Sequence, residues 1–348
     1  MAKASKRAMI RRIVTGLAFT ACLHISFLAA AQQAIPTEAT ADKVLAVPAK
    51  EVPQGWAFKL NVGASGSYGE SSNVVGTADG ATVQVGLFLN GSVNLVEDQN
   101  SWENTLKIKE TETRTPQVEG FFKSADELSL QSTYLYRLPG LDWFGPYARA
   151  AATTELFDSY AVWNTDVSIV RTSRNGATQT SAIPASHRVH LATTFDPTLV
   201  KEGVGAFANP FASKDFTIKT KAGVATQHVI TRNGFVLADN KNTPEIEFQQ
   251  LQNSTQAGGE VEVAMSGQVS DEVTWTAKAD FFYPFYTSVQ SKLEGIDRMS
   301  TDLSAKVSVR LAKWVSLDYV LSVKRLPLIL DLWQVQNNVL LTAGFELL

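Results

Sequence analysis

The stretch 260–269, EVEVAMSGQV, alternates between two kinds of side chain. Its odd positions carry valine, methionine and glycine, and its even positions carry glutamate, alanine, serine and glutamine. Successive side chains of a strand point to opposite faces, so this stretch predicts a strand with one apolar and one polar face. The same alternation recurs in 305–311, AKVSVRL, and in 317–324, where only Val320 interrupts the polar face.

Working outward from these stretches, the sequence holds twelve candidate strands. They are 56–68, 81–96, 101–112, 124–138, 146–158, 186–196, 214–231, 258–270, 272–284, 301–312, 314–325 and 336–348. The pattern is weakest in 146–158, because Arg149 and Glu155 interrupt its apolar face. Crossing a bilayer takes about 9–11 tilted residues, whereas strands of soluble sandwiches commonly have about 5–6. The pattern therefore predicts an all-β chain that forms a single antiparallel transmembrane β-barrel of twelve strands.

The connections between these segments alternate in length. The first (69–80), the fifth (159–185) and the seventh (232–257) are long, whereas the eighth and the tenth are little more than Asp271 and Lys313. Long outer loops and short periplasmic turns are typical of outer-membrane barrels. An even number of strands then places both termini in the periplasm. The exception is the sixth connection, 197–213, which is long on the side of the short turns.

The longest connection, 159–185, contains the apolar residues Trp163, Val167, Ile169 and Val170. Such residues are unfavourable in water, so two arrangements are open. The segment folds into the barrel as a constriction, or it rises above the membrane as an extra hairpin. A soluble β-sandwich would show the same alternation along its strands, but the strand lengths, the loop asymmetry and the N-terminal segment favour the barrel.

The N-terminal segment has the features of an export signal. Basic residues between Lys3 and Arg12 precede the mostly apolar stretch 13–30, and small residues then offer a cleavage site before Gln32. The predicted division is a signal peptide (1–31), a proline-containing periplasmic linker (32–55) and a barrel (56–348). The alternatives are an uncleaved anchor and a lipoprotein modified at Cys22, although Cys22 lacks the usual leucine three positions before it.

Charge and cysteine content exclude several classes of function. The chain carries 31 basic and 34 acidic residues, and removal of five basic residues with the signal leaves 26 and 34, a net charge of −8. Nucleic-acid binders usually show a basic footprint, so nucleic acid is not expected as a partner. The only cysteine is Cys22, so the exported protein is expected to have neither disulfides nor thiolate metal sites.

Several motifs resemble an uncharacterised family of bacterial outer-membrane proteins, which is classed by a domain of unknown function. They are SWENTL at 101–106, KSADEL at 123–128, GPYARA at 145–150, EGVGAF at 202–207, and TPEIE at 243–247 with AGGE at 257–260. The resemblance covers most of 56–348 and implies a barrel, but no activity. Barrel precursors usually end on an aromatic residue that the barrel assembly machinery recognises. This chain departs from that pattern, because it ends on Leu348.

The sequence offers little for catalysis. His187 and His190 are three positions apart, so on a strand they face opposite sides and do not converge on a metal ion. Ser186 and His187 are adjacent and point apart, and the sequence has no G-x-S-x-G motif. Phosphate-binding loops are also absent. We therefore expect no enzyme activity and no cofactor, with an outer-membrane hydrolase as the least favoured reading.

The charged side chains of the polar phase are the candidate lumen residues, since a charge on the lipid side is unfavourable. They are Lys107, Lys109, Lys219, Lys221, Glu260, Glu262, Lys278, Asp280, Lys306, Arg310, Asp318 and Lys324. Two interpretations stay open for this set. It lines a selective pore, or it forms a mutually neutralising network that fills a narrow lumen.

Together these features predict a Gram-negative outer-membrane protein that passes or binds small solutes without catalysis. The alternative is a structural or surface-interaction barrel that acts through its long loops. The expected partners are outer-membrane lipid, lipopolysaccharide and the barrel assembly machinery. The sequence does not identify a solute.

Overall fold

The computed structural model describes residues 54–71, 80–115, 120–213, 215–238, 243–289, 293–327 and 330–347. The expected signal peptide, 1–31, lies outside the described residues, as does the expected linker, 32–55, except for its last two residues. Within the described part of the chain, no helix is long and apolar enough to cross a membrane.

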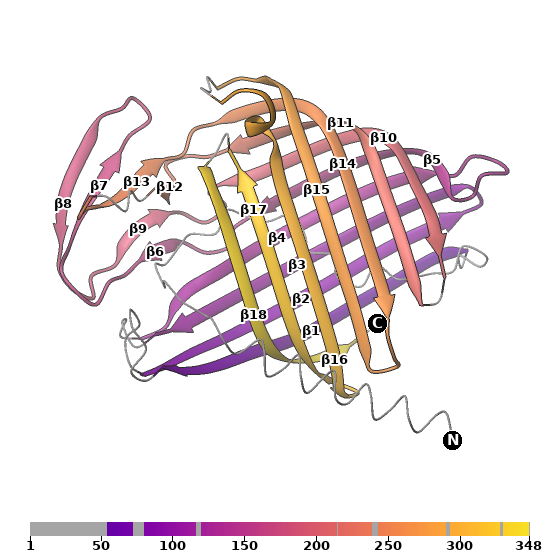
Figure 1. The fold of residues 1–348 in the computed structure, drawn as a ribbon, viewed down its shortest axis with the longest axis horizontal. Coiled ribbons are helices and arrows are strands. Elements are labelled where there is room, and N and C mark those ends of the chain that lie inside the picture. Colours follow the sequence, from indigo (N-terminus) through magenta and orange to yellow (C-terminus); the bar gives the residue numbers. More distant parts are fainter. Residues whose placement is uncertain are drawn as a thin grey trace.

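Twelve antiparallel strands close into one barrel (Figure 1), in the order β1-β18-β17-β16-β15-β14-β11-β10-β5-β4-β3-β2. Their bounds are β1 Gly55–Ser71, β2 Gly80–Glu97, β3 Asn100–Arg114, β4 Phe122–Tyr136, β5 Phe144–Thr154, β10 Thr198–Ala212, β11 Phe216–Ile230, β14 Ser254–Gln268, β15 Val273–Thr287, β16 Ser300–Ala312, β17 Val315–Leu326 and β18 Leu330–Glu346. The predicted fold class and strand number are confirmed.

The two faces of the wall differ as the alternation predicts. Val307 and Leu341 are 40% and 52% exposed on the outside, whereas Asp318 and Lys324 on the other phase are buried. Residues paired across neighbouring strands share a face, so the ladder carries this assignment around the barrel. An apolar outer face around a polar interior is the arrangement of a transmembrane barrel.

One predicted strand was wrong. Segment 186–196 is not part of the barrel, and the predicted connection 197–213 is the barrel strand β10. Positive φ angles at Ser186 and Phe195 break up the first segment, which contributes only the short strand β9, Val189–Ala192. The alternation of β10 is blurred, because its inward positions include Gly203 and Gly205. The anomalous sixth connection thereby disappears.

Strand β5 was placed correctly, but its phase was misjudged. The odd positions of β5 are buried and the even positions from Phe144 to Ala152 are exposed or half-buried, so Arg149 points into the barrel. Its outward positions are Pro146, Ala148, Ala150 and Ala152. Arg149 therefore does not interrupt the lipid-facing surface, and Glu155 lies just beyond the end of the strand.

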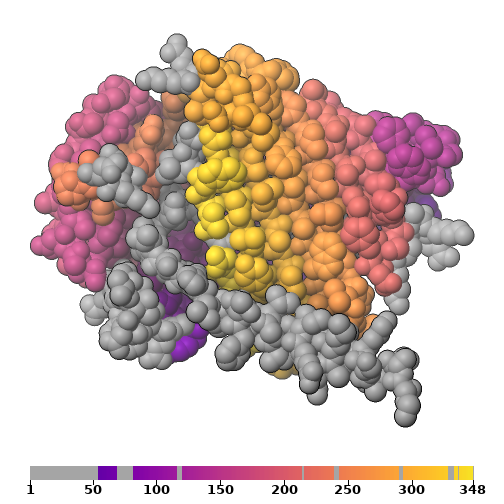
Figure 2. Space-filling view, in the orientation of Figure 1, coloured from indigo at the N-terminus to yellow at the C-terminus, as the bar shows by residue number. Residues whose placement is uncertain are grey.

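The two longest connections fold together beyond the barrel end opposite the short turns (Figures 1 and 2). They contribute β6 Ser159–Ala161, β7 Val167–Thr172, β8 Thr178–Ile183, β9, β12 Phe235–Leu237 and β13 Ile246–Gln250. Strands β7 and β13 pair in parallel, which joins the two connections, and Ile169 and Phe248 lie in their small apolar core. Of the two arrangements left open for 159–185, the structure shows the hairpin, β7–β8.

Candidate functional site: the interior charge network

The charged side chains inside the barrel form a row across neighbouring strands. Lys221 on β11 lies opposite Glu262 on β14, and Glu262 lies opposite Asp280 on β15. The row continues through Asp302 on β16 to Lys324 on β17. The regular register of the barrel therefore brings together residues that lie far apart in sequence.

The centre of this row is a set of hydrogen-bonded ion pairs around Glu260 and Glu262. Arg149 reaches both glutamates, with Nη2–Oε2 of Glu260 at 2.7 Å and Nη1–Oε2 of Glu262 at 2.6 Å. Glu262 also contacts Lys221 at 3.0 Å and Lys278 at 3.2 Å. Each contact is an ion pair between a guanidinium or ammonium group and a carboxylate, which is stronger than a neutral hydrogen bond.

Lys201 and Tyr147 extend this set. The Lys201 ammonium lies 3.2 Å from Glu260 Oε2 and 3.1 Å from Asp280 Oδ1, and the Tyr147 hydroxyl donates to Glu260 Oε1 at 2.6 Å. Lys278 approaches Asp280 at 3.9 Å. We call these eight residues the interior charge network: Tyr147, Arg149, Lys201, Lys221, Glu260, Glu262, Lys278 and Asp280.

A glycine makes room for the network on β10. Gly203 lies between Arg149 on β5 and Ala225 on β11 in the ladder. A Cβ atom at position 203 would lie 2.6 Å from Glu260 Oε1, so any larger residue would displace that carboxylate. The glycine that blurs the strand pattern in the sequence is thus the one that allows an arginine and a glutamate to meet across β10 and β11.

The network is nearly closed to solvent and has both signs of charge. The side chain of Arg149 is 0% exposed, and those of Glu260 and Glu262 are 2% and 9% exposed. Burying charges is favourable only when they are paired, and removing one member of a buried pair costs about 3–5 kcal/mol. With four cations and three carboxylates, the network holds one positive charge in excess.

Two smaller pairs lie along the next part of the wall. Lys306 lies 3.0 Å from Asp318, which also accepts a hydrogen bond from Ser308 at 2.6 Å. Lys324 lies 4.0 Å from Asp302. On the other side of the network, Leu135 and Phe207 pack with Tyr147 as a buried apolar cluster inside the barrel.

All twelve predicted lumen residues lie on the inward phase of their strands. Those in ion pairs are Lys221, Glu260, Glu262, Lys278, Asp280, Lys306, Asp318 and Lys324. Lys107 and Lys109 lie on β3 opposite Ser129 and Glu127. Lys219 lies on β11, and Arg310 lies near the turn between β16 and β17.

Sequence reasoning missed three members of the network. Arg149 was assigned to the wrong phase, and Lys201 fell in a segment expected to be a connection. Tyr147 was not among the candidate lumen residues. The available signal was the alternation of Tyr147, Arg149 and Ala151 with Pro146, Ala148 and Ala150, which is regular once arginine is allowed on the inner face. Within the described residues, no group of three or more histidine, cysteine or acidic side chains is arranged to hold a metal ion.

No protein-family model matches the sequence, and no curated protein matches it significantly. The motif resemblance to the uncharacterised outer-membrane family therefore stays a prediction. Several solved structures are similar in fold. The translocator domain of the autotransporter NalP from Neisseria meningitidis is 9% identical, with 85% of this chain and 90% of that chain covered and a TM-score of 0.38.

An outer-membrane channel from Pseudomonas putida F1 is 10% identical, with 85% and 96% covered and a TM-score of 0.37. The NanC porin is 9% identical, with 83% and 100% covered and a TM-score of 0.35. Likenesses this distant carry no argument about function. The assignment of a transmembrane barrel rests on the strand pairing and on the two faces of the wall.

Proposed function

We propose that this barrel lies in the outer membrane and is a narrow channel for small solutes. The observation that carries the proposal is the polar inner face of a closed barrel of twelve strands. A barrel of about eight strands is filled by its own side chains, whereas one of sixteen strands holds an open channel. Twelve strands enclose more than apolar packing fills, so water enters the lumen.

The narrowing comes from one side of the lumen. The interior charge network covers the wall formed by β5, β10, β11, β14 and β15. On the opposite wall, the inward residues are mostly uncharged, among them Ser65 on β1, Asn90 on β2 and Thr342 on β18. We infer that solutes pass between a charged wall and a neutral polar wall.

The lumen has an excess of positive charge. The inward cations of the described barrel strands are Lys59, Lys107, Lys109, Arg149, Lys201, Lys219, Lys221, Lys278, Lys306, Arg310 and Lys324. The inward carboxylates are Glu103, Glu127, Glu260, Glu262, Asp280, Asp302, Asp318 and Glu346. Eleven cations against eight carboxylates leave an excess of three positive charges, although the whole chain is acidic. A channel lined in this way favours anions.

The experiment is conductance of the purified protein in planar bilayers under a potassium chloride gradient. We expect a small single-channel conductance and a reversal potential close to the equilibrium potential of chloride. The double substitution Lys59→Glu and Lys219→Glu reverses the sign of the excess charge in the lumen. It should move the reversal potential towards the equilibrium potential of potassium. Lys313→Glu changes a charge in a short turn and serves as the control.

Deletion of residues 162–172 tests the role of the outer hairpin. Because β7 pairs with β8 and β13 beyond the barrel, we expect the conductance to stay within about twofold of the wild-type value. Absence of conductance both with and without this segment would overturn the channel proposal.

A second candidate function has one observation in its favour. The two longest connections share an apolar core, with Ala161, Ile169, Val189, Leu191 and Phe248 buried in it. A folded outer sheet is a rigid platform for a partner, which is the surface-interaction alternative. A barrel that never conducts but binds surface partners, and loses that binding on deletion of 162–172, would support it.

A further inference from the structure

The barrel is closed between β1 and β18 over only part of their length. Six residue pairs join the two strands, from Asn61↔Glu346 to Gly66↔Leu341. Beyond them β1 continues to Ser71 and stays paired with β2, and β18 extends back to Leu330 and stays paired with β17. Between the described residues 67–71 of β1 and 336–340 of β18, no pairing continues. In Figure 1 the two strands lie together near the C-terminus and diverge towards the outer loops.

Local sequence accounts for both parts of this seam. In the paired part, the Phe88 ring of β2 lies over two glycines, since a Cβ atom on Gly63 would lie 2.4 Å from its Cζ and one on Gly344 would lie 3.4 Å from it. A Cβ atom on Gly63 would also lie 2.2 Å from the Ala343 carbonyl oxygen, so this close approach requires glycine. Beyond it, β1 carries Gly66 and Gly69 and β18 carries Asn337 and Asn338, which are poor strand formers.

The parting of the strands lies within the membrane. On the outer face of β18, Trp333 and Phe345 are exposed aromatic residues twelve positions apart. Twelve residues of a strand tilted by about 45° span about 28 Å, close to the apolar band of about 25 Å between two aromatic girdles. Residues 334–340 of β18 therefore lie between the girdles, on the side of the outer loops.

A strand edge that has no neighbouring strand at this depth needs a polar environment. An open sheet edge is not tolerated against lipid, but it is tolerated where it lines a cavity that holds water. The described inward side chains beside the gap are uncharged, and Ser67, Gln334 and Asn338 are polar whereas Leu340 is apolar. Gln334 Nε2 is buried and has no hydrogen-bond partner among the described residues. On the outer side lie the exposed apolar residues Val335 and Val339, with the exposed Asn337 between them.

We propose that the lumen opens sideways into the outer leaflet between β1 and β18, and that an amphipathic solute leaves or enters by this route. We call the parted segments, 67–71 and 334–340, the lateral portal. Its inner edge matches the polar head of such a solute, and its outer edge matches the apolar tail. This inference rests on the proposed channel, because the solute reaches the portal through the lumen.

Cysteine cross-linking tests the geometry without any transport assay. The chain's only cysteine, Cys22, lies in the segment expected to be removed. The pair Ser65→Cys with Thr342→Cys stands in the paired part of the seam, and Gly69→Cys with Asn338→Cys continues the same register on the same face. A disulfide needs Cβ atoms about 3.5–4.5 Å apart. Under copper–phenanthroline, the first pair should form a disulfide at least tenfold faster than the second, and equal rates would overturn the portal.

A transfer assay tests what the portal does. Proteoliposomes containing the Gly69→Cys, Asn338→Cys variant receive a fluorescent twelve-carbon carboxylate, and its arrival in the bilayer is followed before and after a short bis-maleimide links the strands. Linking should lower the transfer rate at least fivefold and leave chloride conductance unchanged. A linked Ser65→Cys, Thr342→Cys variant is the control. Unchanged transfer after linking at the portal would overturn the proposal, whereas loss of conductance in the unlinked protein would instead contradict the channel.

Discussion

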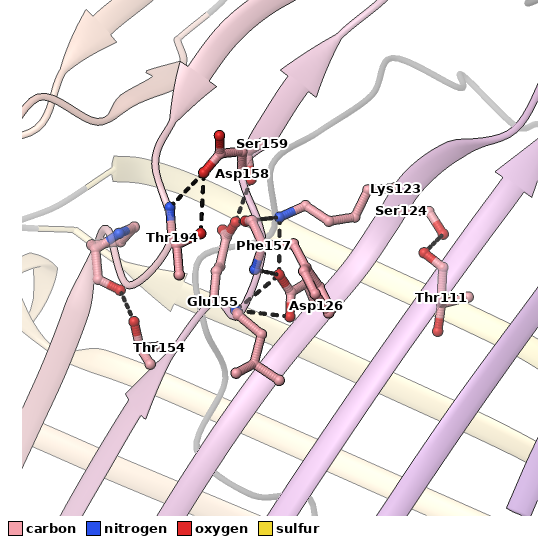
Figure 3. Close-up of polar contacts among 12 residues, drawn as sticks. Thr111, Lys123, Ser124, Asp126, Thr154, Glu155, Phe157, Asp158, Ser159 and Thr194 are labelled. Carbon is pink, nitrogen blue, oxygen red and sulfur yellow. Dashed lines mark hydrogen bonds and ion pairs between the residues drawn. The ribbon is translucent and has the colours of Figure 1, made fainter.

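Two pairs of neighbouring strands, β1 with β18 and β4 with β5, separate before they reach the outer loops. The two gaps differ in the side chains that lie beside them. At the lateral portal, β1 and β18 separate with uncharged side chains on the inner side. Strands β4 and β5 are paired only from Leu128↔Thr154 to Leu135↔Tyr147, and β4 continues to Phe122 without β5. Here charged side chains fill the gap (Figure 3).

The centre of that second region is Asp126, whose side chain is 0% exposed. It accepts hydrogen bonds from the backbone N–H groups of Leu156 at 2.9 Å and Phe157 at 2.7 Å, just after β5 has ended. Lys123 joins Asp126 at 3.0 Å to Glu155 at 2.8 Å and donates to the Phe157 carbonyl at 2.7 Å. We call Lys123, Asp126 and Glu155 the β4–β5 clamp.

The chain beyond the clamp is held in the same way. Burial raises the pKa of Glu155, which Lys123 and the Ser159 hydroxyl oppose by stabilising its charged form. The Thr194 backbone N–H, donating to Asp158, holds the pKa of that carboxyl below its usual value. The comparison shows that loss of strand pairing does not by itself open a barrel wall. Side chains that replace the missing backbone bonds keep it shut, and the portal has none of these charges on its inner side.

The largest effect is expected from breaking the clamp. Asp126→Ala leaves Lys123 without one buried partner and two backbone N–H groups without an acceptor, so we expect a loss of about 3–5 kcal/mol in the free energy of unfolding. Urea titration measures it, and proteolysis of 155–197 should become faster. Asp142→Ala, an exposed acid in the turn before β5, is the control. A stable, protease-resistant Asp126→Ala variant would mean that the clamp does not keep this wall closed.

The second test places one arginine in each kind of wall. Val307 lies in the fully paired wall between β15 and β17, whereas Val339 lies at the outer edge of the portal. Val307→Arg should cost about 2–4 kcal/mol, the usual penalty for a cation in the apolar band. Val339→Arg should cost less than half of that, because the guanidinium can reach water through the gap. Unfolding in lipid vesicles measures both, and equal penalties would argue that the portal is closed.

The third test loosens the paired part of the seam. Phe88→Ala removes a half-buried ring from Gly63 and Gly344, so we expect a loss of about 1.5–3 kcal/mol in the free energy of unfolding. The Ser65–Thr342 cysteine pair should then form its disulfide more slowly in the Phe88→Ala background. Leu87→Ala, an outward neighbour on the same strand, should leave that rate unchanged. If both substitutions slow the disulfide equally, Phe88 has no special role at the seam.

A structural feature could be predicted from the sequence where its cause lies within one segment, and it could not where the cause lies in a distant segment. Strands β14 to β17 were predicted because valine and charge alternate within each segment. Strand β10 was missed because Gly203 interrupts its alternation. The glycine is required there by Glu260, which lies on another strand. The outer sheet was missed for the same reason, since Ile169 and Phe248 form a core only when two connections meet.

The candidate site divides in the same way. The twelve predicted charges lie inside because a charge on the lipid side is unfavourable, which is a rule that any single segment obeys. Which charges meet could not be predicted, because Arg149 reaches Glu260 across two intervening strands, through a register set by the whole barrel. The seam was also invisible, since nothing in either strand alone shows where β1 and β18 separate.

The smallest effect is expected from building a clamp into the portal. Ser67→Lys with Asn338→Asp places opposite charges on the inner sides of β1 and β18, on diagonal positions of the register. Such a pair near water contributes only about 0.2–1 kcal/mol, so stability should hardly change. The transfer rate of the fluorescent carboxylate should nevertheless fall. Stabilising the closed form of the gap by that free energy lowers the fraction of open molecules up to about fivefold. Salt at 1 M should restore the rate by screening the pair.

The control is the like-charged variant, Ser67→Lys with Asn338→Lys, which adds two cations that cannot form an ion pair. It distinguishes an effect of closing the gap from an effect of charge in the path of the solute. If it slows transfer as much as the opposite pair does, the effect comes from charge in the path and not from closing the gap between β1 and β18.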